Sequence, residues 1–310
     1  DPVETGAVTL CLPQDTQSEA FDYPETFLKK KVWHLDRRAL HSRALKEGFN
    51  ILHKAQKPLI IAGGGVHYSQ AAETLRDFAK TFGIPVSETQ AGKSAMNWKD
   101  PMSVGAIGVT GTSAANLLAK DADVVLIVGS RLQDFTTSSK QVFAPDVKLL
   151  NLNVSKFDCL KMDSIMMQAD AKSGLESLSQ NLRKANFQTS DEYKGYVSQL
   201  QSKWNEEVDR LYSLKSKEGN VQTSIVGTLN EFMAPEDLII CAAGSLPGDL
   251  HRLWRSEIPK TYHVEYGFSC MGYEVAGGLG VKMAMEKGEV YIIVGDGSFL
   301  MLHSEILTAI

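Results

Sequence analysis

Cysteine, net charge and long apolar runs are all scarce in this sequence, and each scarcity argues against a class of protein. The four cysteines, Cys11, Cys159, Cys241 and Cys270, lie far apart without a CxxC pair, which argues against a disulfide framework or a zinc site. Such cysteine usage favours a reducing cytoplasm. The 32 Lys and Arg against 37 Asp and Glu give a net charge of -5. That balance argues against a basic surface that binds nucleic acid or an anionic membrane.

The longest apolar runs, such as 124–128 and 290–294, have the length of strands. They fall far short of the roughly 20 residues that a membrane helix needs, and no signal-peptide pattern opens the sequence. A hydrophobic content of 43% with 22% charged residues is that of a folded chain, which excludes intrinsic disorder. At roughly 100–200 residues per domain, the 310 residues predict two or three domains.

The two ends of the sequence both interrupt a structural pattern. The first residue is Asp1 rather than Met, and a strand-like run over 7–12 follows almost at once. The last residue, Ile310, lies inside a helical spacing of apolar residues that no Gly, Asn or Pro closes. We therefore expect a fragment of a longer protein.

Residues 36–184 alternate short apolar runs with helical patterns, and this alternation predicts a parallel sheet covered by helices on both faces. The expected fold class is α/β, with doubly wound parallel sheets. Asp36 is a candidate N-cap for the first helix. We expect helices over 36–55, 70–82, 112–120 and 171–182, and strands over 59–62, 84–87, 124–128 and 148–154.

The rest of the sequence divides around this domain. Residues 1–20 resemble the last strand of a preceding domain, and residues 21–35 are expected to form a linker. The polar segment 185–195 is a second expected boundary, after which residues 196–310 form another α/β domain. In that domain we expect helices over 196–215, 221–234 and 272–285, and strands over 238–241, 261–264 and 289–294.

The run Gly63-Gly64-Gly65 lies between an expected strand and an expected helix. Glycines at such a turn allow backbone N–H groups to approach a phosphate. The surrounding sequence, GGGVHYS, departs from the GxGxxG pattern, and that pattern is weak even when intact. We therefore favour a tight turn without a ligand over a nucleotide site.

A stronger motif is VYIIVGDGS over 290–298, where an apolar strand ends in Gly295, Asp296, Gly297 and Ser298. Ligands bind at the carboxyl edge of a parallel sheet, and a carboxylate such as Asp296 suits magnesium. The glycines would let a diphosphate lie against the backbone, and Ser298 could donate a hydrogen bond. An Asp-Gly hairpin turn is the alternative, but it needs a second strand, and residues 299–310 have helical spacing.

Two upstream segments extend this motif into a family pattern. Ala243-Gly244-Ser245 follows the strand LIIC, and GFSCMGYEVAGGLGVKMAM occupies 267–285. The order of these segments resembles the diphosphate-binding domain of the thiamine-diphosphate enzymes. The resemblance implies thiamine diphosphate and Mg2+ as cofactors, with residues 36–184 as the central domain and residues 196–310 as a truncated diphosphate-binding domain.

The resemblance also implies roles for particular residues. The turn at Gly244, Ser245 and Leu246 would hold phosphate, the Ser269 carbonyl would accept a bond from the aminopyrimidine, and Met271 would support the bent cofactor. Asp296, Gly297 and Ser298 would bind diphosphate, with Asp296 as the metal ligand. The activating glutamate and the second metal element belong to parts of the family pattern outside this sequence, so we assign no catalytic residue here and expect the chain alone to be inactive. We interpret Glu265, Glu274 and His251 as structural or solvated.

Within the family, four stretches resemble the trihydroxycyclohexanedione hydrolases of myo-inositol catabolism. They are GAVTLCLPQDTQSEAFDYP over 6–24, IPVSETQAGKSA over 84–95, GAIGVTGTSAAN over 105–116 and LQDFTTSSK over 132–140. This implies hydrolytic C–C cleavage of a cyclic diketone to 5-deoxy-glucuronate. An acetolactate-synthase-like carboligase with a flavin in its central domain, or a non-catalytic nucleotide-binding module, remains an alternative.

The family also shares its cofactor site between subunits, so the resemblance implies a homodimer or homotetramer. The small-residue helix from Gly272 to Met285 could admit a helix of another subunit, or could pack closely within its own domain.

Overall fold

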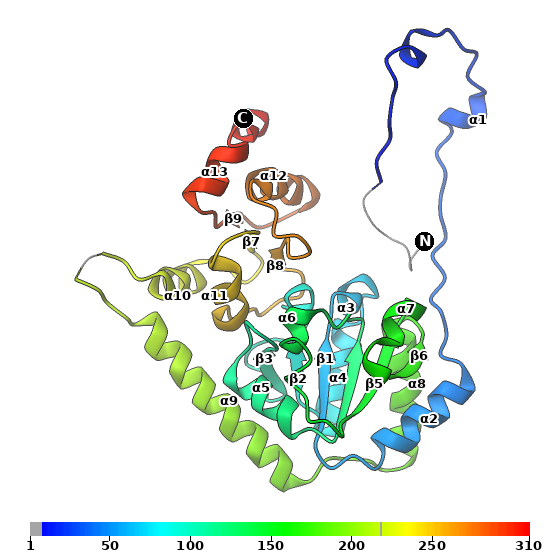
Figure 1. Cartoon of the computed structure of the whole chain (residues 1–310), viewed down its shortest axis with the longest axis vertical. Helices are drawn as coiled ribbons and strands as arrows, with labels where there is room; N and C mark the ends of the chain where they lie inside the picture. The colour runs from blue at the N-terminus through cyan, green and yellow to red at the C-terminus, as the bar shows by residue number, and fades with distance from the viewer. Residues whose placement is uncertain (1–7, 218) are drawn as a thin grey trace.

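The computed structural model describes residues 8–217 and 219–310, and its largest unit is a six-stranded sheet (Figure 1). The strand order is β3-β2-β1-β4-β5-β6, and every neighbouring pair is parallel. This arrangement confirms the predicted doubly wound α/β fold. The strands are β1 (Pro58–Ala62), β2 (Val86–Glu88), β3 (Ser103–Ala106), β4 (Val124–Val128), β5 (Lys148–Asn153) and β6 (Ile165–Gln168).

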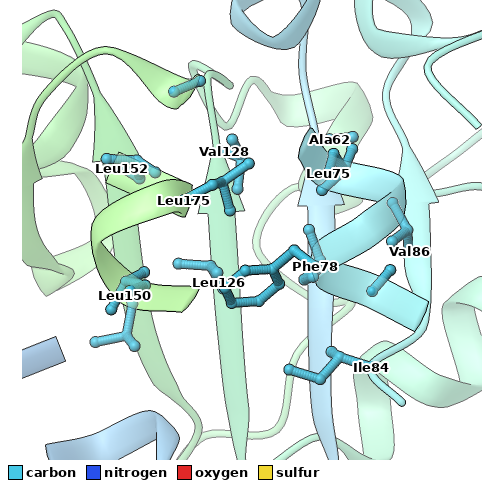
Figure 2. Close-up of a cluster of buried hydrophobic side chains, with 14 of the residues drawn as sticks. Ala62, Leu75, Phe78, Ile84, Val86, Leu126, Val128, Leu150, Leu152 and Leu175 are labelled. Carbon is cyan, nitrogen blue, oxygen red and sulfur yellow. The ribbon is translucent and has the colours of Figure 1, made fainter. Parts of the chain in front are cut away.

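Helices cover both faces of this sheet because its central strands are apolar on both sides. Along β4, Leu126 faces one core and Ile127 faces the other. Figure 2 shows the first core, where Phe78 and Leu175 of the covering helices meet Leu126 and Leu150 of the sheet. The helices over the first core are α2 (Ser42–Leu52), α4 (Ala72–Phe82) and α8 (Ala171–Lys184), and those over the second are α5 (Ser113–Asp121) and α9 (Asp191–Tyr212).

Short helical turns occupy the loops at the carboxyl ends of these strands. Each turn has only three or four residues, so most of each loop is irregular. Irregular loops on a rigid scaffold often carry binding residues. The turns are α3 (Gly65–Tyr68), η2 (Gln90–Gly92), α6 (Asp134–Thr137), α7 (Lys156–Cys159) and η3 (Lys161–Asp163).

A second parallel sheet carries the C-terminal part, in the order β8-β7-β9. Its strands are β7 (Leu238–Cys241), β8 (Tyr262–Val264) and β9 (Val290–Ile292). Its core is smaller and centres on Ile239, Leu250 and Trp254. The helices around it are α10 (Gln222–Phe232), α11 (Leu246–Leu253), α12 (Tyr273–Ala284), α13 (Asp296–Leu302) and α14 (Glu305–Ala309).

The N-terminal segment differs from the sequence-based expectation. Ala7 of the expected strand lies outside the described residues, and residues 8–12 form no strand within the part of the chain that the structure describes. A strand needs a neighbour to satisfy its backbone N–H and C=O groups. Among the described residues no strand pairs with this exposed segment, which extends away from the body in Figure 1. The expected linker contains α1 (Glu25–Leu28), after η1 (Thr16–Ser18).

The predicted cap at Asp36 is wrong. The first helix of the central domain begins at Ser42, six residues later than expected, and the His41 Nδ1 atom accepts a hydrogen bond from the Arg43 amide at 3.2 Å. Residues 36–41 are irregular instead. The apolar spacing that suggested the helix begins only at Leu40, so the pattern located the packed face but not the true start.

The expected boundary at 185–195 is also different in the structure. Helix α9 already begins at Asp191, where the Ser190 hydroxyl accepts a hydrogen bond from the Tyr193 amide at 3.1 Å. Val197 lies in the second core of the central domain, whereas Val208 lies in the C-terminal core. A single helix is therefore part of both domains.

Buried polar contacts join the two domains. The His251 ring, on α11, lies between the Glu88 carbonyl at 3.1 Å and the Thr110 hydroxyl at 2.8 Å. Because a carbonyl only accepts, Nε2 carries the hydrogen and Nδ1 accepts from Thr110. Gln90 continues this contact, since it donates to the Pro247 carbonyl at 2.8 Å and accepts from the Tyr262 hydroxyl at 2.7 Å.

The described helices include none that is both long and apolar enough to cross a membrane. The four cysteines are free, and Cys159 and Cys241 are buried. This agrees with the expectation that no disulfide framework supports the fold.

We expect His251 to make the stability of the chain depend on pH. Burial, assisted by the Lys93 charge, lowers the pKa of His251 from 6.5 to about 3. Between pH 6.5 and about pH 3, the His251 side chain is protonated in the unfolded chain but neutral in the folded chain. The free energy of unfolding should therefore fall as the pH falls through this window. The slope from this residue should approach about 1.4 kcal/mol per pH unit.

Urea unfolding at pH 7, 6 and 5 measures this slope. His251→Gln should remove that part of the slope, whereas His34→Gln, at an exposed position, should leave it unchanged. Equal slopes in the wild type and in His251→Gln would show that His251 is not the responsible group.

Candidate functional site

Three loops of the C-terminal domain meet at one edge of its sheet. They follow β7 at 242–245, β8 at 265–272 and β9 at 293–295. The strands are parallel, so their carboxyl ends lie at the same edge, where ligands bind in such folds. The structure thus brings together the segments that the sequence singled out at Gly244, Met271 and Asp296.

Glu274 links all three loops, and it is fully buried. Its Oε1 atom accepts a hydrogen bond from the Ala243 amide at 3.3 Å, after β7. Its Oε2 atom accepts from the Gly272 amide at 3.1 Å and from the Ser298 hydroxyl at 2.7 Å. Three donors satisfy a carboxylate that would otherwise be costly to bury. The structural interpretation of Glu274 therefore fits its contacts, but its importance for the site was not predicted.

Ser298 takes part in this network rather than facing solvent. The residue is buried, its hydroxyl donates to Glu274, and it accepts from the Gly272 amide at 2.7 Å. The hydroxyl hydrogen that the sequence assigned to a diphosphate is therefore already engaged. In this structure Ser298 ties the GDGS loop to the loop before α12.

The glycines at the tips of these loops leave an open face. Gly244 has a φ of +84°, a conformation that side chains other than glycine rarely adopt. No atom lies within 4 Å of the position that a Cβ would take on Gly244 or on Gly295. The Met271 Cε atom lies 3.7 Å from the corresponding position on Gly297. Met271 therefore borders the GDG turn, a contact that the resemblance did not predict.

Asp296 lies at the exposed end of the turn. Its Oδ1 atom accepts a hydrogen bond from the Gly297 amide at 2.9 Å, and this leaves Oδ2 without a partner among the described residues. No three His, Cys, Asp or Glu side chains within 8–217 and 219–310 gather as metal ligands. A single carboxylate beside an open, glycine-lined surface fits magnesium, which takes phosphate and water oxygens as its other ligands. These residues therefore fit a magnesium diphosphate group.

The remaining candidate residues surround this open face. Ser245 precedes α11, and its hydroxyl donates to Gln222 at 3.3 Å. Leu246, the first residue of α11, packs against the C-terminal core. Ser269 has a φ of +51°, and no donor among the described residues binds its carbonyl oxygen. That carbonyl is free to accept a hydrogen bond from a ligand.

Glu265 shapes the loop that carries Ser269. Its carboxylate accepts hydrogen bonds from the Phe268 amide at 3.3 Å and from the Cys270 amide at 2.7 Å. Both carboxylate oxygens are thus used to hold the backbone, which agrees with the structural interpretation of this residue.

The glycine run 63–65 is explained by packing. A Cβ on Gly63 would collide with the Gly129 carbonyl oxygen, and one on Gly65 would lie 2.6 Å from the Gly129 Cα. The loops after β1 and β4 therefore touch through their backbones. This close approach accounts for the glycines without a nucleotide and agrees with the tight turn that we favoured.

The ETQAGKS segment, 88–94, lies in the interface between the domains. Glu88 is buried, accepts from the Met96 amide at 2.9 Å, and its pKa is raised by burial despite the nearby Lys93 charge. Burial likewise lowers the pKa of Lys93. Ser94 accepts from the Lys260 amide at 2.9 Å. This distinctive segment therefore serves the contact between domains.

The glycines of α12 face their own domain. A Cβ on Gly278 would collide with the Ile292 side chain of β9, and one on Gly277 would lie 2.6 Å from the Tyr273 ring. Of the two interpretations of this helix, close packing within the domain thus explains Gly277 and Gly278. Gly280 has open space around it.

Comparison with known families agrees with this division of the chain. Residues 45–178 match "Thiamine pyrophosphate enzyme, central domain", and residues 242–310 match "Thiamine pyrophosphate enzyme, C-terminal TPP binding domain". The first match contains all six strands of the central sheet, and the second begins directly after β7 and contains β8 and β9.

Three bacterial proteins that resemble this chain share a name. Proteins of Clostridium tetani, Clostridium botulinum and Bacillus cereus, each named 3D-(3,5/4)-trihydroxycyclohexane-1,2-dione hydrolase, are 44%, 46% and 44% identical to this chain. Each match includes 100% of this chain and 52% of the relative, so the chain spans about half the length of these relatives. With both family domains matched in order along one chain, this protein belongs to the thiamine pyrophosphate enzyme family.

Proposed function

We propose that this chain carries the central domain and the diphosphate-binding part of an enzyme that hydrolyses a C–C bond in 3D-(3,5/4)-trihydroxycyclohexane-1,2-dione, yielding 5-deoxy-glucuronate. The observation that carries the proposal is the 44–46% identity, over the whole of this chain, to relatives named as hydrolases of that dione. Because the chain spans about half of those relatives, the proposal concerns the full-length protein, by which we mean the protein at the length of these relatives.

The proposed cofactors are thiamine diphosphate and magnesium. Gly244, Gly295 and Gly297 would let the diphosphate lie against the backbone, and Asp296 would hold the metal that offsets its charge. When bound, thiamine diphosphate supplies a nucleophilic carbon and then an electron sink for the broken C–C bond. The chain's own contribution is to bind and orient, since a positioned reactant reacts far faster than a free one.

Two residues would orient the organic part of the cofactor. The free carbonyl of Ser269 would accept a hydrogen bond from the aminopyrimidine, and Met271, beside Gly297, would support the bend between the two rings. Glu274 and Ser298 would act as positioning residues, because they fix the loops from which these groups project.

We assign no catalytic acid or base to this chain. Both carboxylate oxygens of Glu265 accept hydrogen bonds from its own loop, and Glu274 is fully buried. Burial between the domains keeps His251 neutral. We infer that the groups that move protons lie in a part of the full-length protein outside this chain, and that the chain alone is inactive.

We also propose that the full-length protein is a cytoplasmic homodimer or homotetramer. Support for assembly comes from apolar side chains around the C-terminal sheet that remain exposed, including Phe268, Met283 and Leu300. Sedimentation of the full-length protein tests this part, and a monomer with full activity at low concentration would contradict it.

The reaction is tested by adding the cyclic dione to the full-length protein with thiamine diphosphate and magnesium. We expect one open-chain acid, because the broken bond lies within a ring. The carboligase alternative predicts acetolactate from pyruvate instead. Acetolactate formation without consumption of the dione would overturn the proposal.

We predict that Asp296→Ala weakens magnesium-dependent binding of thiamine diphosphate by at least about 100-fold, because the diphosphate would lose its bridging cation. Calorimetry of the full-length protein with and without magnesium measures this loss. Asp146→Ala, which removes the same charge from an exposed loop ahead of β5, should leave affinity unchanged. Retained affinity in Asp296→Ala would remove Asp296 from the metal site.

We predict that Glu274→Gln disorders the three loops together. The amide keeps one acceptor oxygen but leaves buried donors unpaired, which should reduce the free energy of unfolding by about 1–3 kcal/mol. Thiamine diphosphate affinity should also fall by at least about tenfold, since 1.4 kcal/mol corresponds to that factor.

Hydrogen exchange provides an independent readout for Glu274→Gln. The Gly272 and Ala243 amides should exchange faster than in the wild type, because Glu274 accepts their hydrogen bonds. Glu286→Gln, on the exposed surface after α12, is the matched control. Unchanged exchange at Gly272 and Ala243 would contradict the positioning role.

A further inference from the structure

A large open pocket lies between the two domains, beside the loop that carries Ser269. Its volume is about 720 Å³, within the range of small-molecule sites. Its central-domain side comes from the loop that contains α6 and from Lys161 and Met162 near η3, and its other side comes from the loop after β8. We call it the interdomain pocket. It is lined by Leu132, Gln133, Asp134, Phe135, Lys140, Lys161, Met162, Tyr266, Gly267, Phe268 and Ser269.

The polar side chains of this pocket have free hydrogen-bonding capacity. Among the described residues, no partner engages the amide of Gln133, the carboxylate of Asp134 or the ammonium of Lys140. The Tyr266 hydroxyl is similarly unengaged, and burial raises its pKa to about 12, so it stays a donor at neutral pH. These groups present both donors and acceptors to the pocket.

Lys161 differs from these residues because it is held in place. Its ammonium lies 2.7 Å from the Asp158 carboxylate and donates to the Arg131 carbonyl at 3.0 Å. An ammonium has three hydrogens, so two contacts leave one donor for a ligand. The pocket thus has a fixed cation on one side and the more exposed Lys140 on the other.

Backbone strain is concentrated around this pocket. Of the eleven non-glycine residues described with positive φ, seven lie in its walls or next to them. Such conformations are costly and cluster where a site fixes the chain in an unusual shape. The seven are Leu132, Ser138, Ser139, Lys140, Met162, Asp163 and Ser269.

Packing holds the two walls together. The Phe135 and Tyr266 rings meet edge to face with centroids 5.5 Å apart. Beneath the first wall, the Phe135 carbonyl accepts from the Val109 amide at 2.8 Å, and Gly108 leaves no room for a side chain there. The distinctive stretch 105–116 therefore supports the distinctive stretch 132–140 in one wall of the pocket.

We propose that the interdomain pocket binds the hydroxylated ring of the substrate and that Gln133, Asp134 and Lys140 determine specificity for it. This inference rests on the proposed function. Ring hydroxyls both donate and accept, which matches the mixed lining, and the apolar edges of Phe135 and Tyr266 suit the C–H faces of a saturated ring. Ser269 belongs to this pocket and also to the segment that would hold the cofactor, so a ring bound here would lie beside that segment.

Steady-state kinetics of the full-length protein with the cyclic dione test this assignment. Gln133→Leu and Lys140→Met should each raise KM by about tenfold or more, because each removes a polar contact to the ring. The dissociation constant for thiamine diphosphate should change by less than about twofold, since neither residue belongs to the diphosphate site. Lys148→Met, at the exposed start of β5 on the opposite edge of the sheet, is the matched control.

A binding measurement separates this inference from the proposed function. Calorimetry with myo-inositol, an unreactive cyclic polyol, should show binding to the wild type that Lys140→Met weakens about tenfold. If the wild type fails to cleave the dione, the proposed reaction is wrong, and polyol binding alone decides the role of the pocket. The assignment is overturned if KM is unchanged in both variants, if Lys140→Met does not weaken polyol binding, or if the purified protein carries a flavin in this pocket.

Discussion

Parallel pairing of strands is the constraint on which the remaining structure depends. Because all strands of a parallel sheet run in one direction, the loops that follow them gather at its carboxyl edge. The C-terminal sheet gathers Gly244, Met271 and Asp296 in this way, and the central sheet gathers the 88–94 and 132–140 stretches. These two edges face each other, and the interdomain pocket lies between them. Several loops therefore contribute to the diphosphate site and to the interdomain pocket.

This constraint also explains what could be predicted from the sequence. Apolar runs such as 124–128, buried on both sides, identified the strands and hence the doubly wound fold. The GDG turn was identifiable because a strand, two glycines and a carboxylate are contiguous. Its association with Met271 followed from the order of motifs in a resembling family, and the structure places Met271 against Gly297.

Features that depend on distant partners could not be predicted in the same way. Strands β3 and β6 have only four residues each, too short for a distinct sequence pattern, and they pair with the outer edges of β2 and β5. Glu274 looked like one polar residue on a small-residue helix, since nothing local indicates that an amide 31 positions upstream and a hydroxyl 24 positions downstream would bind it. The wall formed by 132–140 had a recognisable sequence, but the Tyr266 ring opposite it comes from another domain.

The packing of helix α9 limits which insertions and deletions the sequence can accept. Its N-terminal half packs in the central core and its C-terminal half in the C-terminal core. Inserting or deleting one residue between these halves would rotate one by about 100° relative to the other, because an α-helix has 3.6 residues per turn. Surface substitutions along α9 are therefore tolerable, but a change in its length would misalign both domains at once. The number of residues between Val197 and Val208 is thus fixed by the packing of one helix in two cores.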